Sequence, residues 1–268
     1  MAITTLDGFS AGNLPPTEFF KVGTAPKAAG VLHSQFYASG NPQAAAIASP
    51  GLNGAALTSY AGMIPFTNPG SGYSYLSRLV AWATVSCSLL VCDRLWHNSG
   101  IAVTTTGAQG ITTPTWPTRD KNGATAGVGI MVGLEVTAAT TNAGAVTNCT
   151  LAYTGDDGNT GTATMASFPA TASLGTFVPF QFDGTKNHGG VRAISGLTLG
   201  TSLVTGSVAL VAYRVLTMIG LTANTVNQLD ILTGSAVRLY DNTVPFILQL
   251  PTATTATTIG GHLIVAQG

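Results

Sequence analysis

The chain has 268 residues, of which 45% are hydrophobic and only 7% are charged, and its ten basic and ten acidic residues give a formal net charge of zero. An ordinary soluble domain carries about 25% charged residues, and a free monomer with so few charges lacks the repulsion that keeps molecules apart in solution. A disordered chain would be polar and charged, and a nucleic-acid-binding face needs clustered lysine and arginine, which are scattered here. We therefore expect a folded protein whose surface is largely covered by partners.

Membrane insertion and export are not expected. No run of about 18 apolar residues occurs, and the first residues, MAITTLD, have neither the basic start nor the apolar segment of a secretory signal. The three cysteines, Cys87, Cys92 and Cys149, favour free, buried thiols in a reducing cytoplasm. Cys87 and Cys92 are five residues apart on a predicted strand, so they lie on opposite faces and cannot share a metal ion.

Residues 1–72 are predicted to form an irregular N-terminal arm with little regular structure. Turn signals such as LPP, GNP, SPG and NPGSG are dense in it, and one short helix is predicted at residues 42–48, where Pro42 suits the first turn. Apolar aromatic residues in an irregular segment indicate that the arm lies on another surface. The candidate partner-binding residues of the arm are Phe19, Phe20, Phe36 and Tyr37.

Residues 73–220 are predicted to form a jelly-roll-like antiparallel β-sandwich. Residues 76–96 are almost continuously apolar and indicate either a strand pair or one long, bent strand. Five later segments alternate apolar and polar residues with period two and are separated by glycine-rich turns, which is typical of an all-β fold. They are residues 130–136, 147–154, 176–182, 191–199 and 207–218.

The alternation also predicts which side chains share a face. Glu135 lies opposite an inward row of Val132, Leu134 and Val136. Inward-facing side chains are also predicted in the segments 147–154 and 176–182. In the segment 207–218, one row of side chains is predicted on each face of the strand. These are Cys149, Leu151 and Tyr153; Val178, Phe180 and Phe182; and Val211, Tyr213 and Val215 against Leu210, Ala212 and Arg214.

Residues 221–268 are predicted to form a C-terminal hairpin or second arm. Weaker strands are expected at 236–240 and 244–250, before a threonine-rich stretch and the apolar segment 260–265. Pro245 and Pro251 indicate an edge position or a strand that adds to a neighbour, since proline cannot donate a hydrogen bond to a sheet.

The common catalytic motifs are absent from the sequence, including the Gly-x-Ser-x-Gly elbow, the His-Glu-x-x-His helix and the phosphate loop. We therefore predict a non-enzymatic protein with no cofactor, no metal ion and no small-molecule substrate. The segment 156–159 (DDGN) lies between two predicted strands and favours a hairpin turn over a calcium loop. His97 and His188 are interpreted as polar loop residues. The residues leave open a glycosidase-type carboxylate pair, although only two glutamates and eight aspartates are available.

Asp93 and Arg94 form the charged pair inside the apolar run 76–96. A buried arginine usually needs a carboxylate partner, so the pair is read either as a strand-end salt bridge or as a subunit contact. In a regular strand Arg94 and Trp96 share a face. Both are candidate partner-binding residues, together with Trp116 in the loop PTWP, which is expected to be exposed.

The stretch 89–101 (LLVCDRLWHNSGI) resembles a segment of structural proteins of tailed phages, in which a strand ends in Asp-Arg-Leu, an aromatic or apolar residue, and His-x-Ser-Gly. Residues 153–161 (YTGDDGNTG) are similar to the hairpin of that family, and residues 178–194 add a further piece. Together these segments cover about residues 75–220. The resemblance implies a jelly-roll-like virion component, with capsid decoration (cement) as its role.

The expected function is therefore a capsid decoration protein that caps the joints between capsid subunits. Its expected partners are the major capsid protein and copies of itself, arranged as a homotrimer by closed symmetry, and its expected location is the capsid surface after synthesis in the bacterial cytoplasm. One alternative is a tail, collar or fibre-base component of the same virion. An alternative of another class is a carbohydrate-binding module that contacts the host, for which Trp116 is the best ligand candidate.

Overall fold

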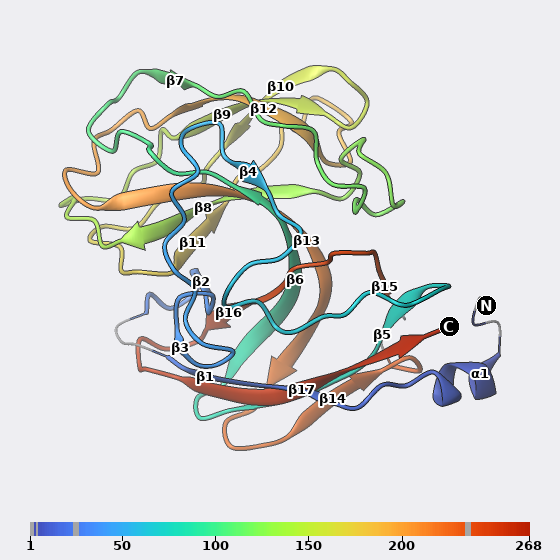
Figure 1. Ribbon diagram of the computed structural model, residues 1–268. Coiled ribbons are helices and arrows are strands. Elements are labelled where there is room, and N and C mark those ends of the chain that lie inside the picture. Colours follow the sequence, from blue (N-terminus) through green and yellow to red (C-terminus); the bar gives the residue numbers. More distant parts are fainter. Residues whose placement is uncertain (1–2, 4, 24–26, 234–236) are drawn as a thin grey trace.

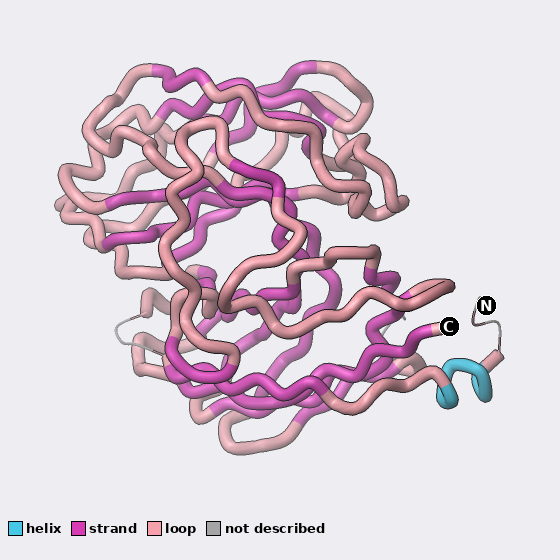
Figure 2. The backbone as a smooth tube through the Cα atoms, in the orientation of Figure 1, coloured by secondary structure: helices cyan, strands magenta, loops and turns pink. Residues whose placement is uncertain are grey.

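The computed structural model describes residues 3, 5–23, 27–233 and 237–268. Within these ranges the chain forms three β-sheets and one short helix (Figures 1 and 2). All pairings between its named strands are antiparallel, and the sheets pack in a sandwich-like arrangement. The predicted all-β class is confirmed.

The central sheet closes on itself. Its strands lie in the order β13 (Ser207–Leu221), β8 (Met131–Ala138), β11 (Thr176–Pro179), β2 (Leu32–Ser34), β16 (Pro245–Pro251), β6 (Cys87–His97) and β4 (Ala55–Ala56). Because β13 also pairs with β6, the first six strands form a ring, which we call the closed sheet. A sheet closed in this way has an inner face that is filled by its own side chains.

Two open sheets flank the closed sheet. Sheet A has the order β14 (Asn227–Asp230), β5 (Ser74–Ala83), β17 (Thr258–Gln267), β1 (Thr17–Val22) and β3 (Ser39–Asn41), and β15 (Val237–Leu239) also pairs with β5. Sheet C has the order β10 (Thr160–Thr164), β9 (Thr150–Gly155), β12 (Val191–Thr198) and β7 (Ala108–Gly110). In Figure 1 sheet C lies at the top, sheet A at the bottom, and the closed sheet between them.

Three apolar cores follow from this layering. The upper core joins sheet C to the closed sheet, the inner core fills the closed sheet, and the lower core joins it to sheet A. The long strand β13 contributes Leu210 to the upper core, Tyr213 to the inner core and Ile219 to the lower core. The predicted alternation in β8, β9, β11 and β13 is confirmed, since side chains two residues apart fall in the same core.

The three predicted segments do not separate in the structure. Strand β1, from the predicted N-terminal arm, lies between β17 and β3, and β2 is part of the closed sheet. Strand β16, from the predicted C-terminal arm, pairs on both sides, with β2 and β6. Its two prolines, Pro245 and Pro251, are the first and last residues of the strand, where a missing donor is tolerated.

Local features match the sequence pattern in part. Residues 76–96 form two strands, β5 and β6, that belong to different sheets, and the hairpin at residues 156–159 joins β9 to β10 as predicted. The predicted helix at 42–48 is irregular, because so short a run is not stable as a helix without packing along its length. Helix α1 (Leu6–Ala11) was not predicted; Thr5 caps it by accepting a hydrogen bond from the Gly8 amide.

Candidate functional site

The structure places six of the seven predicted partner-binding side chains inside the chain's own cores. Phe19 lies in the lower core, Phe36 and Tyr37 in the inner core, and Trp96 and Trp116 in the upper core, while Arg94 is fully buried. These six therefore pack the chain itself rather than offering a surface to a partner. Phe20 is the exception, with 42% of its surface exposed on β1.

Trp116 is not the exposed ligand candidate that the sequence predicts. Its indole N–H donates a hydrogen bond to the Val191 carbonyl at 2.7 Å, and its ring packs 5.6 Å from that of Trp96. Only 2% of Trp116 is exposed. A saccharide or other ligand therefore has no access to this ring.

Arg94 and Trp96 lie on opposite faces of β6, and not on a shared face. The pairing with β13 matches Trp96 to Ala212 and Arg94 to Tyr213, so Leu95 is an extra residue in the strand. Such a bulge reverses the alternation. It turns Trp96 into the upper core and leaves Arg94 inside the closed sheet.

Arg94 is held there by a bidentate ion pair. Its Nη1 and Nη2 atoms donate to the two carboxylate oxygens of Glu135 at 3.1 and 2.6 Å, and its Nε donates to Nδ1 of His97 at 3.2 Å. The Tyr37 hydroxyl donates to the same carboxylate at 3.2 Å. Phe36 stacks on the guanidinium, 4.5 Å from its ring centre. The expected carboxylate partner of Arg94 is thus Glu135 on β8.

Burial and the ion pair set the protonation states of this network. Burial is the largest single effect on the pKa of Arg94 and lowers it, but the interactions with Glu135 and Tyr37 together exceed this effect and raise the pKa above its ordinary value. Burial, followed by the Arg94 charge, lowers the pKa of His97 to about 3. Burial also raises the pKa of Tyr37, with Glu135 adding to the shift. At neutral pH Arg94 is therefore charged, whereas His97 and Tyr37 are neutral. His97 is a core residue rather than a polar loop residue.

A second ion pair lies beside the first. Asp93 accepts hydrogen bonds from Nε of Arg119 at 3.0 Å and from the Val244 amide at 2.9 Å. Arg119 also donates to the carbonyls of Leu57 and Arg94. Both side chains are buried. This pair ties the loop before β8 to β6 and to the segment leading into β16.

Asp120 organises the loop that leads into β8. One of its carboxylate oxygens accepts hydrogen bonds from the amides of Asn122 and Ala124, and the other accepts from those of Gly127 and Val128. The side chain is fully buried. The glycine-rich segment 127–133 is thus a turn that enters a strand.

These networks leave few charges at the surface. Eight of the twenty charged side chains are buried, so twelve are at least partly exposed over an accessible surface of 10849 Å². The buried ones are Lys21, Lys27, Asp93, Arg94, Arg119, Asp120, Glu135 and Arg214. The exterior is therefore even poorer in charge than the composition indicates.

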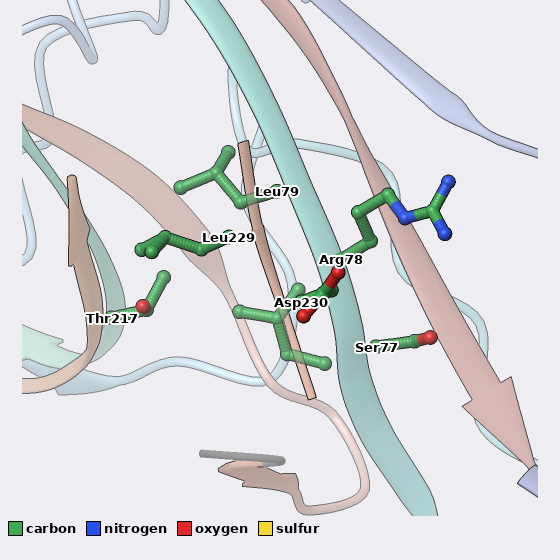
Figure 3. Close-up of a pocket in the computed structure, with 7 residues that line it drawn as sticks. Ser77, Arg78, Leu79, Thr217, Leu229 and Asp230 are labelled. Carbon is green, nitrogen blue, oxygen red and sulfur yellow. The ribbon is translucent and has the colours of Figure 1, made fainter. Parts of the chain in front are cut away.

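The edge of sheet A at β14 presents apolar side chains. Leu232, just after β14, is 82% exposed, and Leu6 of α1, which borders the same hollow, is 62% exposed. Asp230 fixes the turn by accepting hydrogen bonds from the amides of Leu232 and Thr233, and these bonds, the first of them foremost, lower its pKa. Figure 3 shows that the neighbouring Leu79 and Leu229 extend toward the side on which Thr217 lies. We call the surface of Leu6, Phe9 and Leu232 the β14 edge.

A polar cluster connects strand β9 of sheet C to two neighbouring loops. The Tyr153 hydroxyl is 2.7 Å from Nδ1 of His188, and Nε2 of His188 is 3.3 Å from the Asp157 carboxylate. These contacts join the β9–β10 hairpin to the loop before β12. Among the described residues, no group of three or more histidine, cysteine or acidic side chains is placed to hold a metal ion.

Comparison with known proteins yields one weak structural likeness. No family model matches the chain, and no curated protein matches it. A solved structure, the infectious bursal disease virus VP2 subviral particle, is similar with a TM-score of 0.15 and 11% identity. The match covers 94% of this chain and 64% of that chain, and so weak a likeness carries no argument. Within the ranges that the structure describes, no helix is long and apolar enough to cross a membrane.

Sequence reasoning missed the residues that organise these networks. The strand pattern places Glu135 on the face opposite Val132, Leu134 and Val136. The burial of Glu135 follows from the closure of the sheet, which a strand pattern does not reveal. Arg119 and Asp120 lie in a loop, where no periodicity exists. The sequence offers one signal for Arg119 and Asp120: charged residues are scarce in this apolar chain, and a charged side chain that is buried in it needs a partner.

Proposed function

We propose that the chain is a structural virion protein that decorates a capsid as a homo-oligomer, most simply a trimer. The observation that carries this proposal is the withdrawal of eight of the twenty charged side chains into the interior. A free soluble protein of this size normally carries charge over about a quarter to a third of its surface residues. The exterior here is suited to contact with other protein surfaces instead.

The physical reason is desolvation. Removing a charged group from water costs on the order of several kcal/mol per ion unless the group finds a partner. The central parts of protein interfaces are accordingly depleted of charged residues. Because only twelve charged side chains are exposed on this exterior, other proteins can cover large areas of it at little desolvation cost. The β14 edge offers apolar side chains for such a contact, beside a strand that pairs on one side with β5 among the described strands.

The resemblance of residues 75–220 to tailed-phage structural proteins supplies the kind of particle. The internal ion pairs add a second element of support, because each holds two parts of the chain together and leaves none of its charges at the surface. A protein that caps joints in a shell needs a rigid body of this kind.

The test is an inventory of purified particles. Heads and tails of the source phage are separated, and the chain is quantified in each by mass spectrometry against the major capsid protein. If the chain decorates the capsid, it should be found in heads only, with a copy number comparable with that of the capsid protein. A few copies confined to tails would support the tail, collar or fibre-base alternative, and absence from both fractions would contradict a virion role.

A further inference from the structure

The outer face of sheet A carries a group of side chains that is distinct from the β14 edge. The strand register places Asn41, Phe20, Gly260 and Trp82 side by side across β3, β1, β17 and β5. The adjacent row on the same face contains Glu18, His262 and Val80. Sheet A lies at the bottom of the molecule in Figure 1, with this face directed away from the closed sheet.

Glycine at position 260 makes room for an aromatic platform. A Cβ atom on Gly260 would lie 2.7 Å from the Trp82 ring, so the indole lies directly over the strand backbone. The Phe20 ring follows at 6.1 Å between ring centres, tilted by 52°. Phe20 is 42% exposed and Trp82 is half-buried. The two rings therefore form a continuous apolar floor open to solvent, which we call the aromatic platform.

Polar groups border the platform. The hollow above it has a volume of about 400 Å³, within the range of about 300–1,000 Å³ that is usual for small-molecule sites. Glu18, Asn41 and His262 line it. Within the described part of the chain these three side chains make no hydrogen bond, so a carboxylate, an amide and an imidazole are free to pair with a ligand.

We propose that the aromatic platform binds a neutral saccharide. A sugar ring has an apolar face of C–H groups, which suits an aromatic floor, and a rim of hydroxyls, which suits bordering hydrogen-bonding groups. Glu18 is the charged side chain of this lining, so a phosphate or another anion would be repelled. This inference is independent of the capsid role, because it concerns a different surface from the β14 edge.

The experiment measures binding of neutral oligosaccharides to the full-length protein. The probes are hexasaccharides of glucose in α and β linkage, of mannose, of galactose and of N-acetylglucosamine, tested by calorimetry and by tryptophan fluorescence. Fluorescence reports this site well, because Trp96 and Trp116 are buried and Trp82 is half-buried. At least one probe is expected to bind and to change the Trp82 emission. No binding of any probe at millimolar concentration would overturn the proposal.

Variants locate the site. Trp82→Ala is expected to weaken binding of that probe at least tenfold, Trp82→Phe to retain most of it, and Glu18→Gln to weaken it several-fold. Leu232→Ala, at the β14 edge, serves as the control and should bind as the wild type does. Circular dichroism and the melting temperature show whether each variant folds. Equal binding by a folded Trp82→Ala variant would overturn the proposal.

Discussion

The guanidinium of Arg94 and the carboxylate of Glu135 meet at 2.6 Å inside the closed sheet, with both side chains fully buried. Their strands, β6 and β8, are not adjacent, because β13 lies between them. The pair therefore links two walls of the closed sheet through its interior. Phe36 covers the guanidinium, and the Tyr37 hydroxyl donates a hydrogen bond to the carboxylate.

Removing one partner of this pair is expected to destabilise the fold strongly. Glu135→Leu leaves Arg94 charged and unpaired in an apolar interior, which typically costs about 3–5 kcal/mol. The free energy of unfolding from urea denaturation measures the effect. The double variant Arg94→Met with Glu135→Leu is the matched control, and it should recover a large part of the loss. A single variant within 1 kcal/mol of the wild type would show that the pair is not buried as described.

Acid is expected to weaken the protein from about pH 6.5 downward. His97 and His33 have pKa values lowered to about 3 and about 4, in each case first by burial and then by a nearby cation, Arg94 or Lys27. In the unfolded chain both take up a proton near pH 6.5, whereas the folded chain keeps them neutral. The unfolded state thus binds more protons, so each histidine lowers the free energy of unfolding by about 1.4 kcal/mol per pH unit in this window.

Denaturation at pH 7.0, 6.0 and 5.0 measures that slope. His97→Gln should reduce it by about half, since one of the two protons is removed. A wild-type stability that is flat between pH 6.5 and 5 would argue against neutral, buried histidines.

Asp120→Asn is expected to loosen the loop before β8. The amide nitrogen of asparagine would face one of the two pairs of backbone N–H groups that now donate to the carboxylate. An unsatisfied buried group costs about 1–3 kcal/mol. Urea denaturation and limited proteolysis within residues 120–128 measure the change. Asp241→Asn, at an exposed position, is the control, and equal behaviour of the two variants would contradict the role of Asp120.

The strand pattern of the sequence predicts much of the local structure and little of the pairing. Alternation places Leu134 and Glu135 on opposite faces of β8 correctly, because period two is a local property of a strand. It does not reveal that both faces are buried, since that depends on β13 closing the sheet against β6. It likewise misses the bulge at Leu95, which separates Arg94 from Trp96. Of the neighbouring Phe19 and Phe20, one packs the lower core and the other is exposed, as alternation requires.

The N-terminal region is expected to be part of the folding unit rather than a detachable arm. Deleting residues 1–22 removes β1, which covers β17 and brings Phe19 into the lower core, so this truncation should be insoluble or unfolded. Deleting residues 1–11 removes α1, which has no buried residue, and should leave the melting temperature within a few degrees of the full chain. Expression yield and circular dichroism distinguish the two outcomes. A well-folded protein that starts at residue 23 would contradict the integration of β1 into sheet A.

The scarcity of exposed charge is the basis of the proposed role, and it is tested most directly by the mass of the purified protein in solution. Multi-angle light scattering across a concentration series should give one discrete oligomer, a trimer under closed symmetry. Leu232→Glu, which places a charge at the β14 edge, should dissociate it, while Met218→Glu, at an exposed position on β13, serves as the control. A stable, dispersed monomer at high concentration would contradict the claim that neighbours cover this surface.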